Sequence, residues 1–309
     1  MKLQESQLSA TRHGFGAAGL PPALAEFNKH LYMVWNGPEG DDRVFFSSFN
    51  GKVWASQQQV PAIRSSTGAA LAVFNHKLCV AWRGDSSSPG IFLTTFDGGT
   101  WGLPQKVGEA ASSAAPRLAV LGDRLFMAWK GEDEDSRIYW STYDGSVWAA
   151  QQSVPNAATG GGPAIACYKD TAYLVWKGRS GDKGLYWSKC NGATLSAPQV
   201  IPGVESDEGP SLAALDDALY AVWRSRSSDP ALWVSSFDGA SWAPQRQIES
   251  SAGSAGPGLA VFNGALYAAW KGELGDQSIW YSRYKGGIWA VMRKIAGMAT
   301  SPELIGAAG

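Results

Sequence analysis

Short apolar runs recur along the chain at a constant interval. A tryptophan closes one of these runs in every copy, and the step from copy to copy is 47 residues throughout. This first tryptophan series comprises Trp35, Trp82, Trp129, Trp176, Trp223 and Trp270. A constant period of this length is typical of repeat architectures, in which each copy is one supersecondary unit. The repeat therefore has to be interpreted before any local propensity.

Each copy predicts four short strands. The first, as in residues 116–121 (PRLAVL), is almost wholly apolar, and the second, as in residues 125–129 (LFMAW), is apolar on both faces. Such runs are typical of strands that are covered on both sides. The third strand has an aromatic residue at a fixed position: Phe45, Phe92, Tyr139, Tyr186, Trp233 and Trp280. An Asn-Gly or Asp-Gly pair follows in five copies, and because both residues tolerate positive φ it predicts a tight hairpin before the outer strand.

Four antiparallel strands in each of six copies predict an all-β fold, a six-bladed β-propeller. The repeats are expected near 21–67, 68–114, 115–161, 162–208, 209–255 and 256–296, as one domain. A solenoid would need polar capping units, whereas all six copies are equally apolar, which favours a closed ring. Residues 1–20 are expected to form an N-terminal arm and residues 297–309 a tail. Either segment could latch the ring by pairing across its seam.

A second tryptophan series follows the hairpin and is expected to open the outer strand. It comprises Trp54, Trp101, Trp148, Trp242 and Trp289, with Leu195 at this position in the fourth copy. We expect it to brace the outer strand against the third. A leucine in one copy is compatible with that packing role.

The alternation of strand direction predicts which loops share a face. The loop between the second and third strands and the link to the next blade lie on one side, here called the upper face. These are the longer loops, and binding residues usually lie on such loops above a rigid scaffold. We therefore expect any ligand site on the upper face.

Two polar series accompany the first tryptophans on that face. A cation follows the tryptophan directly in five copies, and an aspartate lies five residues beyond the cation position in five copies. The cations are Arg83, Lys130, Lys177, Arg224 and Lys271, with Asn36 in the first copy. The aspartates are Asp41, Asp135, Asp182, Asp229 and Asp276, with Ser88 in the second copy.

An indole beside a cation and a carboxylate suits a sugar. The apolar face of a pyranose stacks on the indole, and its hydroxyls hydrogen-bond to the charged groups. The alternative interpretation is blade-to-blade packing of the tryptophan with a solvated ion pair next to it. Both interpretations stay open, and both can hold if one face of the indole is covered and the other is free.

Composition narrows the function classes. With 26 Lys and Arg against 27 Asp and Glu the net charge is −1, so the chain lacks the basic footprint of a nucleic-acid binder or of a membrane-surface protein. No window suits a membrane span, and the first ten residues lack the apolar core of a signal peptide. The localisation therefore stays open between the cytoplasm and non-classical export.

No cofactor or metal site is expected. The three cysteines lie at three different repeat positions, and the three histidines do not recur. The aspartate series supplies one carboxylate per blade, whereas calcium needs six or more oxygens close together.

Enzymatic activity is not expected. The segment from Ser141 to Trp148 resembles the Asp-box of sialidases, but here the Asp and Gly are adjacent, and that box is a structural hairpin. The acidic run 132–135 could supply paired carboxylates for glycoside hydrolysis, yet it occurs in one copy only. Catalytic propellers tend to carry insertions in some loops, and the 47-residue step has none.

The six copies and the repeated W-[KR]-G and Y-[YW]-S segments resemble the β-propeller lectins of fungi and bacteria. This resemblance implies sugar sites between blades and a multivalent carbohydrate-binding protein whose partners are glycans or glycoconjugates. Six shallow sites on one rigid face would add avidity without new contacts. The alternative is a non-enzymatic scaffold that binds a protein partner through the loops of the upper face.

Overall fold

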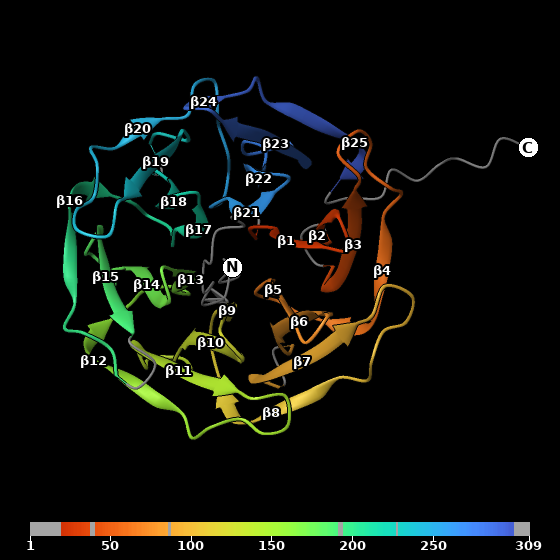
Figure 1. Ribbon diagram of the computed structural model, residues 1–309, viewed down its shortest axis with the longest axis vertical. Helices are drawn as coiled ribbons and strands as arrows, with labels where there is room; N and C mark the ends of the chain where they lie inside the picture. Colours follow the sequence, from red (N-terminus) through yellow and green to blue (C-terminus); the bar gives the residue numbers. More distant parts are fainter. Residues whose placement is uncertain (1–19, 38–40, 86–87, 191–193, 227, 300–309) are drawn as a thin grey trace, which may run out of the picture.

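The structure is a computed structural model, and it describes residues 20–37, 41–85, 88–190, 194–226 and 228–299. Six sheets are arranged as blades around a central axis, and each is built from consecutive strands in simple antiparallel order (Figure 1). The prediction of an all-β, six-bladed propeller is confirmed. The described residues include no helix of the length and apolar character needed to cross a bilayer.

The first and second strands of each blade lie nearest the axis. The first strands are β1 (Ala23–Phe27), β5 (Ala69–Phe74), β9 (Arg117–Leu121), β13 (Ala164–Tyr168), β17 (Ser211–Leu215) and β21 (Gly258–Phe262). The second strands are β2 (His30–Asn36), β6 (Lys77–Arg83), β10 (Arg124–Lys130), β14 (Thr171–Lys177), β18 (Ala218–Arg224) and β22 (Ala265–Lys271).

The third and outer strands complete each blade. The third strands are β3 (Arg43–Phe49), β7 (Gly90–Phe96), β11 (Arg137–Tyr143), β15 (Gly184–Cys190), β19 (Leu232–Phe237) and β23 (Ser278–Lys285). The outer strands are β4 (Gln58–Arg64), β8 (Gln105–Ala111), β12 (Gln152–Ala158), β16 (Gln199–Glu205), β20 (Arg246–Gln247) and β25 (Arg293–Ala299), and β24 (Ile288–Trp289) pairs with β23.

The outer strands depart from the sequence interpretation in where they begin, in how they pair and in where the last one ends. Each second-series tryptophan in blades 1, 2, 3 and 5 forms an isolated bridge to the end of the third strand, and the outer strand begins a few residues later. In five blades this strand then bulges against the third strand, whereas β20 keeps only two residues. β25 runs to Ala299, so the predicted boundary at residue 296 falls inside it. The predicted arm, apart from Leu20, and the tail beyond Ala299 lie outside the described residues.

The two hairpins of a blade use different turn chemistry. Between the first and second strands both central residues have positive φ in several blades, as at Asn28 (48°) and Lys29 (61°). After the third strand only one residue, the glycine, does in blades 1, 2, 3 and 5, as at Gly98 (107°), whereas in blade 6 both Gly286 (59°) and Gly287 (88°) do. The Asp97 carboxylate instead accepts the backbone N–H groups of Gly99 and Thr100, at 2.8 and 2.7 Å. The predicted hairpin is therefore present, but its aspartate acts as an acceptor and does not take positive φ.

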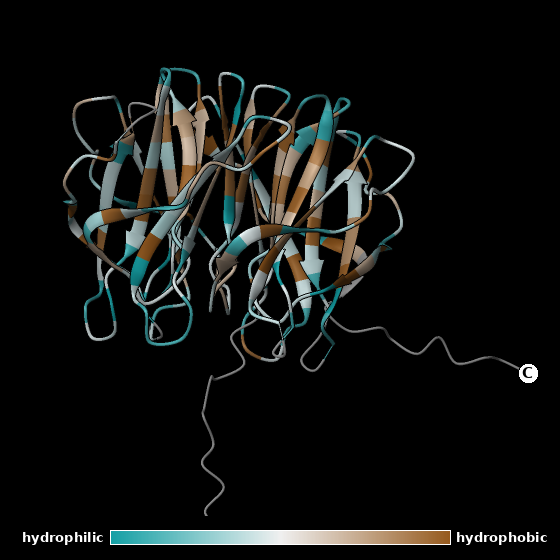
Figure 2. Cartoon of the chain, turned by 90° about the horizontal axis from the view of Figure 1, so that it is seen from below, coloured by the Kyte–Doolittle hydropathy of each residue, from teal (hydrophilic) through white to brown (hydrophobic). Residues whose placement is uncertain are grey.

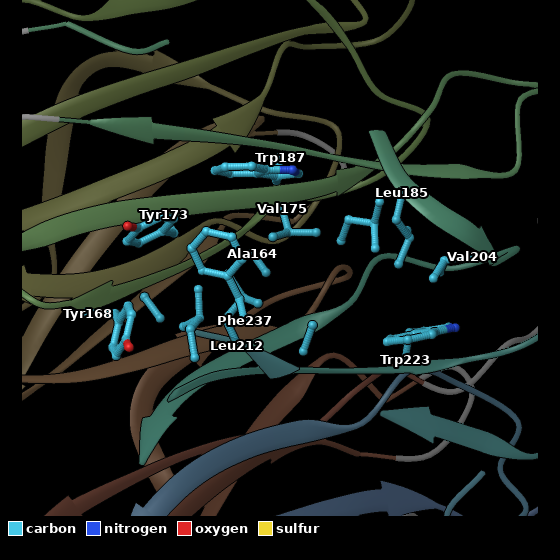
Figure 3. Packing of buried hydrophobic residues seen from close by; sticks show 14 residues of the cluster. Ala164, Tyr168, Tyr173, Val175, Leu185, Trp187, Val204, Leu212, Trp223 and Phe237 are labelled. Atoms are coloured by element: carbon cyan, nitrogen blue, oxygen red, sulfur yellow. The ribbon is translucent and has the colours of Figure 1, made fainter. Parts of the chain in front are cut away.

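The core lies between neighbouring blades. Side chains from both faces of each sheet interdigitate with the next blade, as Figure 3 shows for blades 4 and 5 with Tyr173, Trp187, Trp223 and Phe237. The apolar colour accordingly runs along the strands, and the loops at both ends are more polar (Figure 2). Phe237 contacts Tyr173 of the preceding blade, with ring centroids 5.5 Å apart. Because the core is made of such interfaces, each blade depends on its two neighbours.

The seam between blades 6 and 1 repeats this packing. Phe49 and Tyr267 occupy the same repeat positions as Phe237 and Tyr173, and their ring centroids lie 6.1 Å apart. Trp54 contacts Tyr281 across the same seam, also at 6.1 Å. Within the described residues no blade takes a strand from another, so side-chain packing closes the ring.

Small residues bring the blades close together around the axis. The position before the first strand holds Pro21, Gly68, Ala115, Gly162, Gly209 and Gly256. A Cβ on Gly209 would lie 2.7 Å from the Gly162 carbonyl oxygen, and one on Gly162 would lie 2.8 Å from that of Ala115. Larger side chains here would push neighbouring blades apart.

Candidate functional site

The first tryptophan series lies in the interior. Each member ends a second strand, and their exposed fractions range from 0 to 3%. Trp129 stacks on Tyr139 of the third strand with ring centroids 6.0 Å apart, and Trp35, Trp82 and Trp176 stack in the same way on the third-strand aromatics of their blades. Trp223 packs beside Leu185 and Val204 of the preceding blade (Figure 3). In this conformation the indoles serve blade packing and offer no open face.

In three blades the cation after the tryptophan ties the loops of the upper face together. The Lys130 ammonium donates to the Ser113 hydroxyl (2.7 Å) and the Asp133 carbonyl (2.8 Å), and its burial lowers the pKa of Lys130. Arg83 and Arg224 donate to inter-blade links, to the carbonyls of Ser112 (2.7 Å) and Gly253 (2.9 Å). Asn36 donates likewise to the Ser65 carbonyl. Lys177 and Lys271 are partly exposed. The bonds from Asn36, Arg83, Lys130 and Arg224 thus join the link between two blades to the second strand of one of them.

The aspartate series shapes the loop between the second and third strands. One carboxylate oxygen accepts the backbone N–H two residues further on, as from Asp135 to Arg137 (3.0 Å). The same bond forms at Asp41, Asp182, Asp229 and Asp276. Each carboxylate is thus fixed by its own loop, and all five are partly exposed.

The other carboxylate oxygen reaches the third-strand aromatic in four blades. Tyr139 and Tyr186 donate their hydroxyls to Asp135 (2.8 Å) and Asp182 (3.0 Å). Trp233 and Trp280 donate their indole N–H groups to Asp229 (3.4 Å) and Asp276 (2.7 Å). The structure therefore joins each of these four aspartates to a partly exposed aromatic of the third strand.

In two blades an arginine lies next to the aspartate and the third-strand aromatic. Arg43 forms an ion pair with Asp41 (2.6 Å), and Arg137 forms one with Asp135 (2.8 Å). Both guanidinium groups lie over the third-strand ring, 5.3 Å from the centroids of Phe45 and Tyr139. Hydrogen bonds from Arg137 hold the pKa of Asp135 well below its usual range. A cation, a carboxylate and an aromatic thus do meet on the upper face: the carboxylate is the predicted aspartate, whereas the cation and the aromatic are not the lysine or arginine and the tryptophan that the sequence pattern aligns with it.

A pocket of about 820 Å³ opens between blades 4 and 5. We call it the blade 4–5 pocket, and its polar and aromatic lining comes from Asp182, Lys183, Glu205, Arg226, Asp229 and Trp233. The β14–β15 loop and the bulged strand β16 form one wall, and the β18–β19 loop with Trp233 forms the other. Its volume falls within the range of small-molecule sites.

The charged side chains of this pocket form ion pairs but remain accessible to solvent. Arg226 donates to Glu205 across the blade boundary, and both side chains are about half exposed. Lys183 forms an ion pair with Asp207 at 2.9 Å. The pocket therefore offers an indole with two carboxylates and a guanidinium–carboxylate pair, which together can stack on and hydrogen-bond to a polyol ring.

The combination of a glutamate with an arginine distinguishes this blade boundary from the others, whereas the boundary between blades 1 and 2 has Arg64 and Asp85, with the charges reversed. The position of Glu205 holds Arg64, Ala111, Ala158 and Ala252 in other blades, and that of Arg226 holds Asp85, Glu132, Arg179 and Glu273. Among the described residues only blades 4 and 5 combine glutamate with arginine here. The sequence interpretation missed both residues because it followed what the copies share, and the signal lies in what they do not.

No metal centre is evident in the part of the chain that the structure describes, where no three His, Cys, Asp or Glu side chains lie close enough to hold an ion. No disulfide joins the three cysteines, of which Cys79 and Cys190 are buried and Cys167 is partly buried.

Comparison with known proteins supports the fold. No profile of a known protein family matches the chain, and no curated protein sequence does. Among solved structures, a fucose-recognising lectin of Aleuria aurantia is 11% identical with a TM-score of 0.71, and the match covers 92% of this chain and 97% of that one. AofleA of Arthrobotrys oligospora is 12% identical with a TM-score of 0.69, covering 89% and 86%. A protein of unknown function from Dyadobacter fermentans is 11% identical with a TM-score of 0.62, covering 88% and 93%. At these identities the likeness shows a shared six-bladed fold.

Proposed function

We propose that this protein binds carbohydrate, with its principal site in the blade 4–5 pocket. The observation that carries the proposal is the partly exposed Trp233 beside two fixed carboxylates and the Arg226–Glu205 pair. The apolar face of a pyranose stacks on the indole, while ring hydroxyls donate to the carboxylates and accept from the guanidinium. The fold resemblance to propeller lectins supports this ligand class, and because the Aleuria aurantia structure is described as recognising fucose, fucosylated glycans are the first ligands to test.

Further, weaker sites are proposed at the other blade boundaries. Asp135 with Tyr139 and Asp276 with Trp280 repeat the carboxylate and aromatic. They lack the glutamate–arginine pair, so each would hold a sugar through fewer charged hydrogen bonds. Several such sites on one rigid ring raise avidity for a dense glycan.

The proposed activity is binding without hydrolysis. Glycoside cleavage needs one carboxylic acid held protonated opposite a second carboxylate. In the pocket, Glu205 pairs with Arg226, and Asp182 and Asp229 each accept one hydrogen bond from a backbone N–H and one from the third-strand aromatic of their blade, so all three carboxylates are already engaged as acceptors. We therefore expect no release of product from a bound glycoside.

A glycan array with the purified protein tests the proposal, followed by titration of the best monosaccharide into two pairs of variants. We expect Trp233→Ala to weaken binding about tenfold or more, as truncation of a central aromatic does in other interfaces. Phe92→Ala is its control, because Phe92 holds the same repeat position in a blade whose loop has Ser88 in place of the aspartate. Arg226→Ala should also weaken binding, whereas Arg179→Ala, at the same position in blade 4, should not.

Two results would overturn the proposal. A blank array from folded, monodisperse protein would leave the protein-interaction scaffold as the better account. Equal losses in Trp233→Ala and Phe92→Ala would mean that the variants act through stability and that the pocket is not the site.

A further inference from the structure

The central channel contains a charge that the proposed sugar site does not use. All six first strands line a cavity of about 60 Å³ on the axis. One repeat position contributes to it from every blade, with Ala23, Ala70, Arg117, Ala164, Ser211 and Gly258. Five of these residues are small and neutral, so the channel holds one guanidinium among short side chains.

Arg117 has no acidic partner among the described residues. Its Nη1 donates to the carbonyl of the neighbouring Pro116 at 3.1 Å, and none of the ion pairs within those residues includes it. Burial lowers the pKa of Arg117 to about 10, so the group stays charged at neutral pH. Arg117 is partly buried, and a cation that is withdrawn from water without a counter-charge is normally paired.

The walls of the cavity add no negative side chain to the Arg117 guanidinium. Each first strand is the inner edge of its sheet, so its channel-side backbone N–H and C=O groups have no partner strand, and the N–H groups are available as donors. The remaining lining is made of leucine, isoleucine, alanine and proline, which supply no carboxylate. Ser211 donates its hydroxyl to the Pro257 carbonyl (2.6 Å), which leaves its oxygen as an acceptor only.

We infer that the channel binds one small inorganic oxyanion, of the size of phosphate or sulfate, on the Arg117 guanidinium. The planar fork of arginine matches two oxygens of such an anion, and edge N–H groups of the first strands can take up the others. The cavity has room for a few water molecules, which is also the room that a tetrahedral oxyanion needs. The bound anion would neutralise the channel and link strands from several blades, so it would stabilise the closed ring.

Phosphate titration by calorimetry, with thermal unfolding in phosphate, in sulfate and in chloride at matched ionic strength, tests this inference. We expect one phosphate per wild-type chain, displaced by sulfate, and a midpoint of unfolding that rises with either oxyanion. Arg117→Met should lose about tenfold or more in affinity, because a hydrogen-bonded charge pair is removed. Arg124→Met is the control, since Arg124 is a half-exposed arginine at the start of β10, away from the channel lining.

Several results would overturn the inference. One is the absence of saturable phosphate binding to the wild-type protein, and another is equal affinity in Arg117→Met and Arg124→Met. If Arg117→Met does not fold, Arg117→Lys replaces it: lysine keeps the charge but lacks the fork, so unchanged affinity would refute the assignment to the guanidinium. Because sugar binding is measured separately at the blade 4–5 pocket, either proposal can fail without the other.

Discussion

At the scale of single residues, the repeated aspartates show how one side chain can be structural and accessible at once. Asp135 accepts three hydrogen bonds from Arg137 and one from Tyr139. The Arg137 guanidinium is the main reason that the pKa of Asp135 is lowered. The charged carboxylate is therefore part of the folded loop.

This pairing predicts a pH-dependent contribution of Asp135 to stability. Because the folded pKa lies below the unfolded one, the contribution is complete above pH about 4 and disappears as the pH falls through the lowered pKa. Asp135→Asn should thus lower the urea midpoint at pH 7, and the gap to wild type should narrow on acidification. Glu134→Gln, in the same loop, controls for the change in net charge. If both variants follow one pH curve, the contribution is not specific to Asp135.

At the scale of the element, the loop between the second and third strands closes over its own aspartate. Gly131 follows Lys130 and lies so near Asp135 that a Cβ would stand 2.5 Å from the carboxyl carbon. The same crowding occurs at Gly37, Gly178 and Gly272 with the aspartates of their blades. In these four blades the glycine leaves the space that the aspartate occupies, whereas blade 5 has Ser225 at this position beside Asp229.

Gly131→Ala should accordingly destabilise the protein by about 1–3 kcal/mol, the range for overpacking at a site that cannot relax. The aspartate cannot move aside without losing its hydrogen bonds to Arg137 and Tyr139. Gly161→Ala is the matched control, because a Cβ there meets nothing within 4 Å. Urea unfolding of both variants gives the comparison, and equal midpoints would mean that the loop rearranges freely.

Elements were predictable from the sequence to different degrees. The number of blades, the strand order and the face of the long loops follow from the 47-residue period. Each copy contains four short strands joined by turns at fixed positions, and few folds other than a propeller accommodate six such copies. Exposure of the aromatics did not follow. Trp223 and Trp233 face each other in register on neighbouring strands, yet Trp223 is fully buried and Trp233 is partly open. The difference depends on where the next blade lies, which one repeat does not encode.

The blade 4–5 pocket was hidden for a related reason. Glu205 and Arg226 belong to different blades and meet only when the ring forms. Neither residue belongs to a repeated series, so an interpretation based on periodicity passes over both. Sites formed at blade boundaries are found by asking where a copy departs from its series and which loop faces it.

At the scale of the whole molecule, every blade is complete within one continuous stretch of chain. The seam between blades 6 and 1 uses the same aromatic positions as the boundary between blades 4 and 5. Within the described residues, the boundary between the last and the first blade is therefore packed like the boundary between blades 4 and 5.

The chain should consequently tolerate circular permutation. A five-residue link from Ala299 to Ala23 would match the one that joins Glu205 to Ser211, and new ends could be placed in the link between blades 3 and 4. We expect such a permutant to keep the far-ultraviolet circular dichroism and the cooperative thermal unfolding of the wild-type protein. A permutant that stays unfolded would show that the present order of the blades along the chain is needed for folding. The six blade boundaries would then be equivalent in the folded ring but would form at different stages of folding.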